Sequence, residues 1–88
     1  MPVIEWPESF EKYVRKLSPA ITKKLKQKII LLANDPSHPS LRSKPIKGAP
    51  GIYEASIDMN YRLTYERLEG DVLRLRVVAK HDEALRNP

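Results

Sequence analysis

The stretch that decides the fold runs from residue 52 to residue 66 and reads IYEASIDMNYRLTYE. On either side of Met59-Asn60, apolar and aromatic residues alternate with polar ones, a pattern typical of two half-buried strands joined by a turn. The stretch therefore predicts a β-hairpin with one buried face and one polar face. The buried face would hold Tyr53, Ala55, Ile57, Tyr61, Leu63 and Tyr65, and the polar face Glu54, Ser56, Asp58, Arg62, Thr64 and Glu66.

A third strand is predicted directly after this hairpin. Glu69-Gly70 suits a second hairpin turn, because glycine tolerates a positive φ, and residues 72–80 alternate again. The segment therefore predicts an antiparallel meander. Strict alternation would bury Leu73, Leu75, Val77 and Ala79 and would place Arg74, Arg76, Val78 and Lys80 on the polar face.

The first half of the chain reads as a short strand followed by two helices. Residues 3–6 suit the strand, Pro7 the start of the first helix and Ser18-Pro19 the start of the second. The apolar faces of the helices hold Phe10, Tyr13, Val14 and Leu17, then Ile21, Leu25, Ile29 and Leu32. We therefore expect one α+β domain over residues 1–88, ordered β-α-α-β-β-β. A two-helix hairpin would pack on a twisted, mainly antiparallel four-stranded sheet.

The composition narrows the class of function. The chain has 16 Lys and Arg against 11 Asp and Glu and a net charge of +5, which favours an anionic partner. It has no cysteine, so disulfides and thiolate sites are excluded, and neither His38 nor His81 has ligand-spaced partners. We expect no metal and no cofactor. No apolar run is long enough for a membrane span and MPVIEWPESF is not a secretory signal, so we expect a cytoplasmic protein.

The long connection over residues 35–51 contains four prolines and also carries Arg42, Lys44 and Lys47. A connection of this length in a small domain is usually functional or mobile, and we expect this one to be so.

The polar face of the meander is the main clue to function. Its basic residues Arg62, Arg74, Arg76 and Lys80 would share the face with acidic residues. One interpretation is a solvated face of mixed charge; the other is an anion site, because arginine binds phosphate in a bidentate manner. Glu54 is either a general base or the salt-bridge partner of an arginine on the next strand.

His81 comes at the end of the third strand. Strict alternation would place it on the buried face, but alternation weakens at a strand end. It is either a histidine bonded to the backbone or a proton donor, since histidine titrates near neutrality. Asp82 and Glu83 would orient it, or simply begin a short helix over residues 82–86. His38 lies in Pro-Ser-His-Pro and is interpreted as a solvated loop residue.

Three segments together resemble the RelE/ParE superfamily of bacterial toxins: Lys47–Tyr53, Asn60–Tyr65 and Val77–Glu83. The resemblance implies two helices on a twisted antiparallel sheet. It also implies metal-independent cleavage of mRNA, often on the ribosome, in which the 2′-OH of the RNA attacks the adjacent phosphate. The partners would be mRNA, the ribosome and an antitoxin that forms a hetero-oligomer with the toxin.

The resemblance also implies roles for individual residues. Arg62 matches the arginine that holds the phosphate, and His81 matches the acid or phosphate stabiliser of the last strand. Glu54 lies where one branch has a lysine, and other branches use a carboxylate as base. Leu85 replaces an aromatic residue common in the nucleases. RNA contacts would come from Lys44, Lys47 and Lys80. Arg74 and Arg76 would either bind RNA as well or pair with Glu54 and Glu66. The alternatives are a non-catalytic, ParE-like inhibitor of DNA gyrase and an inactive binding module.

Overall fold

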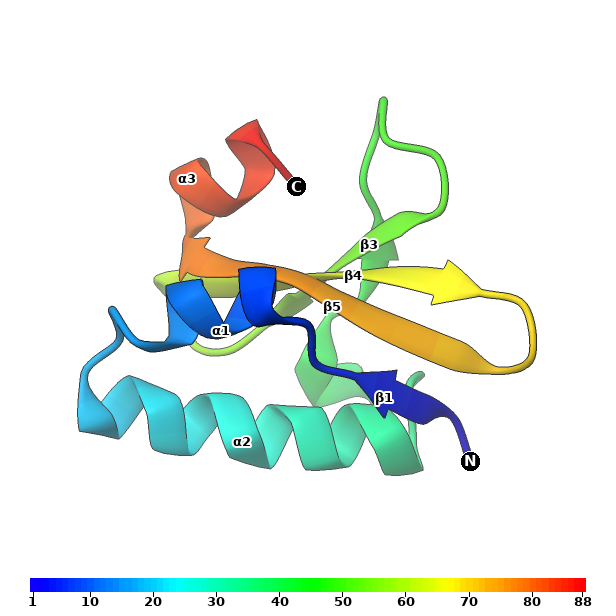
Figure 1. Cartoon of the computed structure of the whole chain (residues 1–88), viewed down its shortest axis with the longest axis horizontal. Coiled ribbons are helices and arrows are strands. Elements are labelled where there is room, and N and C mark those ends of the chain that lie inside the picture. The colour runs from blue at the N-terminus through cyan, green and yellow to red at the C-terminus, as the bar shows by residue number, and fades with distance from the viewer.

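A computed structural model describes all residues from 1 to 88 and has an α+β fold (Figure 1). The elements in chain order are β1 (Val3–Glu5), α1 (Glu8–Val14), α2 (Pro19–Asn34), the short 3₁₀ helix η1 (Pro39–Leu41), β2 (Lys44–Pro45), β3 (Ile52–Ser56), β4 (Tyr61–Leu68), β5 (Val72–Lys80) and α3 (His81–Arg86). None of the helices is both long and apolar enough to cross a membrane.

The strands form one sheet in the order β1-β5-β4-β3-β2. β1 runs parallel to β5, and all other pairs are antiparallel. The predicted meander and helix pair are confirmed. The predicted strand count of four is wrong, because Lys44–Pro45 adds a short fifth strand at the edge beside β3.

The connection between α2 and β3 is attached to the body of the domain. Leu41 in η1 is fully buried, and the hydroxyls of Ser43 and Tyr65 are hydrogen-bonded. His38 accepts a hydrogen bond from the backbone N–H of Ser40 (3.1 Å) and so caps η1. His38 therefore has a local structural role in this connection.

The main core lies between the helix pair and one face of the sheet. Ser18 caps α2 by accepting a hydrogen bond from the backbone N–H of Ile21 (3.3 Å), and Pro19 takes the first helical position. α2 then turns one apolar stripe towards the sheet. The buried residues of this core include Phe10, Val14, Leu25, Ile29, Leu32, Leu63, Tyr65, Leu73, Leu75 and Val78.

Ile29 and Ile30 offer a direct test of how α2 is oriented. Ile29 is 9% exposed, whereas its neighbour Ile30 is 63% exposed. Replacing Ile29 by valine should lower the free energy of unfolding by about 0.5–1.5 kcal/mol, because a buried methylene is lost. The same change at Ile30 should leave it nearly unaltered. Urea unfolding of both variants measures the difference, and equal losses would contradict this orientation of the helix.

A β-bulge in β5 changes the predicted faces. Thr64 pairs with Val77 but Tyr65 pairs with Leu75, so Arg76 is an extra residue in the ladder. An extra residue reverses the alternation beyond it. The prediction that residues 73, 75, 77 and 79 share one face is therefore wrong, and so is the prediction that Val78 and Lys80 lie on the polar face.

The bulge gives the opposite face of the sheet a second, smaller core. Val77 and Ala79 point to that face and pack with Ala84 of α3. α3 lies on the side of the sheet away from α2 (Figure 1). The polar face is thus only partly open, because α3 covers the end of it at which β5 terminates.

Candidate functional site

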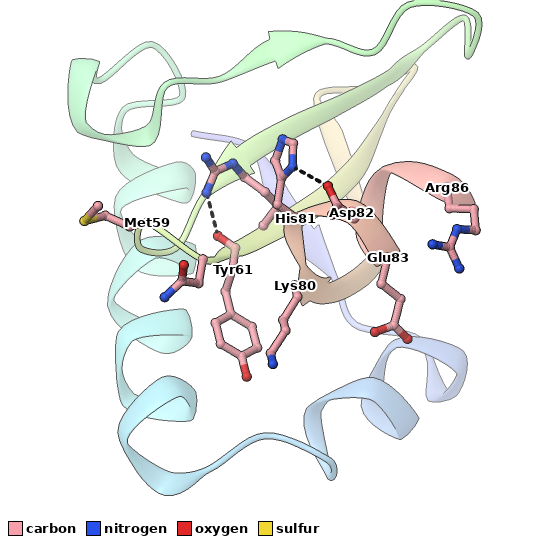
Figure 2. A pocket seen from close by; sticks show the side chains of 9 residues that line it. Met59, Tyr61, Lys80, His81, Asp82, Glu83 and Arg86 are labelled. Carbon is pink, nitrogen blue, oxygen red and sulfur yellow. Dashed lines mark hydrogen bonds and ion pairs between the residues drawn. The ribbon is translucent and has the colours of Figure 1, made fainter.

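The candidate site is a hollow where the turn between β3 and β4 meets the start of α3 (Figure 2). Its volume is about 980 Å³. Most of its lining residues are polar, and both Arg62 and His81 are among them. The full set is Met59, Asn60, Tyr61, Arg62, Lys80, His81, Asp82, Glu83 and Arg86.

The bulge in β5 brings Arg62 and His81 to the same side of the sheet. Arg62 lies opposite Ala79 in the β4–β5 ladder, and His81 follows two residues later. His81 is the first residue of α3, directly beyond the end of this ladder. Lys80 instead lies opposite Tyr61, and Figure 2 shows His81 pointing away from both of these side chains. Without the bulge, His81 would have the parity of the main core.

The guanidinium of Arg62 is held through Nη1 and lies beside one carboxylate. Its Nη1 donates to the carbonyl oxygens of Asp58 (2.7 Å) and Tyr61 (3.1 Å), and its Nε lies 3.9 Å from Oε1 of Glu54. Nη2 makes no hydrogen bond within the protein. The side chain is 18% exposed, and Arg62 is one of the residues that line the hollow. An arginine fixed in this way can bind an anion without reorganising.

His81 is held by its backbone and by one carboxylate. Its N–H donates to the carbonyl oxygen of Asn60 (2.8 Å), and its Nδ1 lies 3.2 Å from Oδ1 of Asp82. Nε2 has no partner within the protein, and the side chain is 48% exposed. A ring with one nitrogen on a carboxylate and the other free towards a hollow has the geometry of a proton donor or acceptor.

Asp58 shapes the turn between these two residues. Its Oδ1 accepts the backbone N–H groups of Asn60 and Tyr61, both at 2.9 Å, and its Oδ2 lies 3.5 Å from Nζ of Lys24 in α2. Desolvation by itself would raise the pKa of Asp58. The two backbone hydrogen bonds and Lys24 outweigh it, and the pKa of Asp58 is lowered from its ordinary value.

The lowered pKa of Asp58 predicts how stability depends on pH. Its folded-state pKa lies below 3.8, so the ionised form stabilises the fold fully above 3.8. Asp58→Asn keeps the acceptor and removes the charge. At neutral pH we expect it to reduce the free energy of unfolding by about 0.5–1 kcal/mol. The difference from wild type should disappear as the pH falls through the folded-state pKa. Denaturation of both proteins across this range checks the sign, and a difference that grew in acid would contradict it.

Comparisons with solved structures match nearly the whole chain. YafQ from E. coli strain BL21(DE3) is 22% identical, with 96% of this chain and 98% of that chain covered and a TM-score of 0.77. The isolated E. coli RelE toxin is 23% identical, with 98% and 97% covered and a TM-score of 0.71. The YoeB/ParE toxin from Agrobacterium tumefaciens is 18% identical, with 90% and 98% covered and a TM-score of 0.74.

The chain has the RelE/ParE toxin fold. The resemblance noted in the sequence is therefore confirmed at the level of the fold. No protein-family model matches the chain, and a search of curated proteins finds no match.

Two of the predicted RNA-binding residues on this RelE/ParE fold, Arg74 and Arg76, already form ion pairs within the protein. Nε of Arg74 lies 2.8 Å from a carboxylate oxygen of Glu5, and Glu66 is shared by Arg74 (3.8 Å) and Arg76 (3.4 Å). The hydrogen bond with Glu5 raises the pKa of Arg74 above its usual value. Arg76 also donates from Nε to the carbonyl oxygen of Pro88 (2.8 Å). These charges are largely compensated within the protein.

The three predicted lysines lie at separate places around the sheet. Lys44, in the edge strand β2, is opposite Glu54 and therefore on the same face as Arg62. Lys47 follows β2 and is exposed. Lys80 lines the hollow, but its side chain lies on the helix side of the sheet with Tyr61.

Glu54 is paired and buried. It is 7% exposed, and the nearest cation is the Arg62 guanidinium.

No group of three or more histidine, aspartate or glutamate side chains is placed to hold a metal ion. The sequence predicts a turn at Met59-Asn60 but does not assign Asp58 to the site. The available signal is that an aspartate at the start of a turn commonly accepts the backbone N–H two residues later, as in an Asx turn.

Proposed function

We propose that this chain is the toxin of a toxin–antitoxin pair and that it cleaves mRNA as a metal-independent endoribonuclease. The observation that carries the proposal is that Arg62, whose Nη2 has no partner, and His81, whose Nε2 has no partner, line the same hollow. The fold shared with YafQ and RelE toxins supports it. The net charge of +5 suits a polyanionic substrate.

The reaction needs only groups present in the hollow, the RNA and water. The 2′-oxygen of the RNA attacks the adjacent phosphorus and gives its proton to water, while the bond from phosphorus to the 5′-oxygen breaks. The free Nη2 donors of Arg62 bind the non-bridging oxygens, whose charge grows in the transition state. Protonated His81 donates from Nε2 to the leaving 5′-oxygen. The products are a 2′,3′-cyclic phosphate and a 5′-hydroxyl.

In this mechanism Glu54 orients Arg62 and does not act as the base. Its burial and its position 3.9 Å from Nε of Arg62 support this assignment. Its Oε1 faces Nε of the guanidinium, so the carboxylate is placed to hold the side chain of Arg62 in position. Asp82 similarly orients His81 through Nδ1.

The flanking RNA strand would follow the basic residues around the hollow. Lys44 and Lys47 have no ion-pair partner in the structure and would contribute more than Arg74 and Arg76, which are already paired. Lys80 would contact RNA only at the rim of the hollow.

The proposed partners are mRNA, the ribosome and a cognate antitoxin in the cytoplasm. Solved structures with this fold include an intact E. coli RelBE toxin–antitoxin complex and an E. coli DinJ–YafQ toxin–antitoxin complex. We propose that this chain likewise forms a hetero-oligomer with an antitoxin, whose acidic groups would complement its basic charge.

The test is RNA cleavage by the purified chain, carried out on free RNA in the presence of EDTA and on RNA bound to ribosomes in the presence of the Mg²⁺ that keeps ribosomes assembled. We expect cuts that leave a cyclic phosphate and a 5′-hydroxyl, identified by end-labelling and mass spectrometry. Cleavage that needs a divalent ion, or intact RNA in both settings, would contradict the proposal. Cutting only with ribosomes would place the substrate in the translating complex.

A second candidate function is inhibition of a protein such as DNA gyrase without catalysis. The compensation of Arg74 and Arg76 by Glu5 and Glu66 favours it, because it weakens the RNA-binding surface. Leu85 in place of an aromatic residue points the same way. Induced expression separates the two candidates, because the nuclease stops translation first and the gyrase inhibitor stops supercoiling first.

A further inference from the structure

We infer that Asp58 is a positioning residue that sets Arg62 and His81 together through one turn. The inference rests on the proposed function, since it assigns a role in that cleavage. Asp58 touches neither RNA nor the reacting atoms in the mechanism above. Its effect would pass through the backbone of residues 58–61.

The carboxylate of Asp58 fixes the shape of the turn. Oδ1 accepts two successive backbone N–H groups, those of Asn60 and Tyr61, at 2.9 Å each. Such an Asx turn fixes the direction of the carbonyl groups that follow it. The backbone N–H of Ile57 closes the same turn on the carbonyl oxygen of Tyr61 (3.0 Å).

Three carbonyl groups of this turn hold the two functional residues. The carbonyl oxygens of Asp58 and Tyr61 accept Nη1 of Arg62, at 2.7 and 3.1 Å. The carbonyl oxygen of Asn60 accepts the backbone N–H of His81 at 2.8 Å. Rotation of the turn would therefore move the arginine and the first residue of α3 at the same time.

The two carboxylate oxygens of Asp58 interact with different partners. Oδ1 forms the turn, whereas Oδ2 lies 3.5 Å from Nζ of Lys24. Asparagine can keep the first interaction while losing the charge. Glutamate keeps the charge but carries the acceptor one methylene further from the backbone. Comparing the two therefore separates positioning from simple electrostatics.

We expect Asp58→Glu to lower kcat by about 10–100-fold, because small misplacements of catalytic groups are costly. Asp58→Asn should keep a kcat near that of wild type. The affinity for a 2′-deoxy RNA, which cannot react, should change little in both variants. Glu69→Gln, at an exposed position in the other hairpin turn, is the matched control for loss of a negative charge. Equal losses in the two Asp58 variants, or an unchanged Asp58→Glu, would overturn the inference.

A readout that does not use activity separates this inference from the proposed function. Hydrogen exchange of the His81 amide reports its bond to Asn60. We expect slow exchange in wild type and Asp58→Asn, and exchange about tenfold faster in Asp58→Glu. If wild type leaves RNA intact but this order holds, the proposed function fails and the positioning role stands. Uniform exchange in all three proteins would overturn the role. Should Asp58→Glu fail to fold, Asp58→Ala replaces it with the same expected loss.

Discussion

Replacing Arg62 by alanine should lower the rate of RNA cleavage by about 10²–10³-fold, the usual cost of losing one fixed donor to a developing anion. The expectation rests on geometry. Nη1 is already bound to two carbonyl oxygens, so the Nη2 donors are preorganised for the phosphate. The loss should appear mainly in kcat, because charge on the non-bridging oxygens grows in the transition state.

Two controls make the Arg62 result specific. Arg62→Lys keeps the charge but loses the planar fork, so it should recover only a small part of the rate. Arg67→Ala removes the same charge from β4, at a position where the guanidinium lies 4.1 Å from the centre of the Tyr53 ring. It should cut RNA nearly as well as wild type. A loss in Arg67→Ala as large as that in Arg62→Ala would show that only overall charge matters.

Glu54→Gln resolves the role of the buried carboxylate. If Glu54 only orients Arg62, its effect should be small once Arg62 is already alanine, because the two residues act through one interaction. If Glu54 were the base, Glu54→Gln would lower the cleavage rate by the same factor whether residue 62 is arginine or alanine. The cycle of Glu54→Gln, Arg62→Ala and both together therefore tests the assignment made from the 3.9 Å contact.

Local pattern was enough to predict the hairpin and most of the core. The alternation in residues 52–66 and the helical spacing of Leu25, Ile29 and Leu32 each describe a face that must be buried. The edge strand Lys44–Pro45 is not predictable from local pattern, because two residues carry no period and are paired only through β3. Pairing of this kind is a tertiary property.

The candidate site depended on one feature that alternation cannot show. The bulge at Arg76 reverses the faces beyond it, so His81 leaves the side of the main core and joins Arg62. Nothing in VLRLRVV distinguishes a regular strand from a bulged one, since Val77, Val78 and Ala79 are all apolar. The resemblance to a toxin family pointed to both residues, but only the register explains how they meet.

His81→Ala should lower cleavage by about 10²–10⁴-fold, the range expected when a general acid is removed. The half-exposed ring has only Asp82 as a side-chain partner, so the change should barely affect stability. Thermal unfolding monitors this. His38→Ala is the matched control, because the other histidine caps η1 in the connection before β2 and does not line the hollow.

The assignment of His81 as the acid can be tested by changing the leaving group. In an RNA with sulfur in place of the bridging 5′-oxygen, the phosphorus–sulfur bond breaks to give a thiolate that leaves without a proton. On this substrate the difference between wild type and His81→Ala should nearly vanish, whereas the defect of Arg62→Ala should persist. An undiminished defect of His81→Ala would mean that the ring stabilises the phosphate instead. Nε2 of His81 would then act alongside Nη2 of Arg62, and the proton for the 5′-oxygen would come from water.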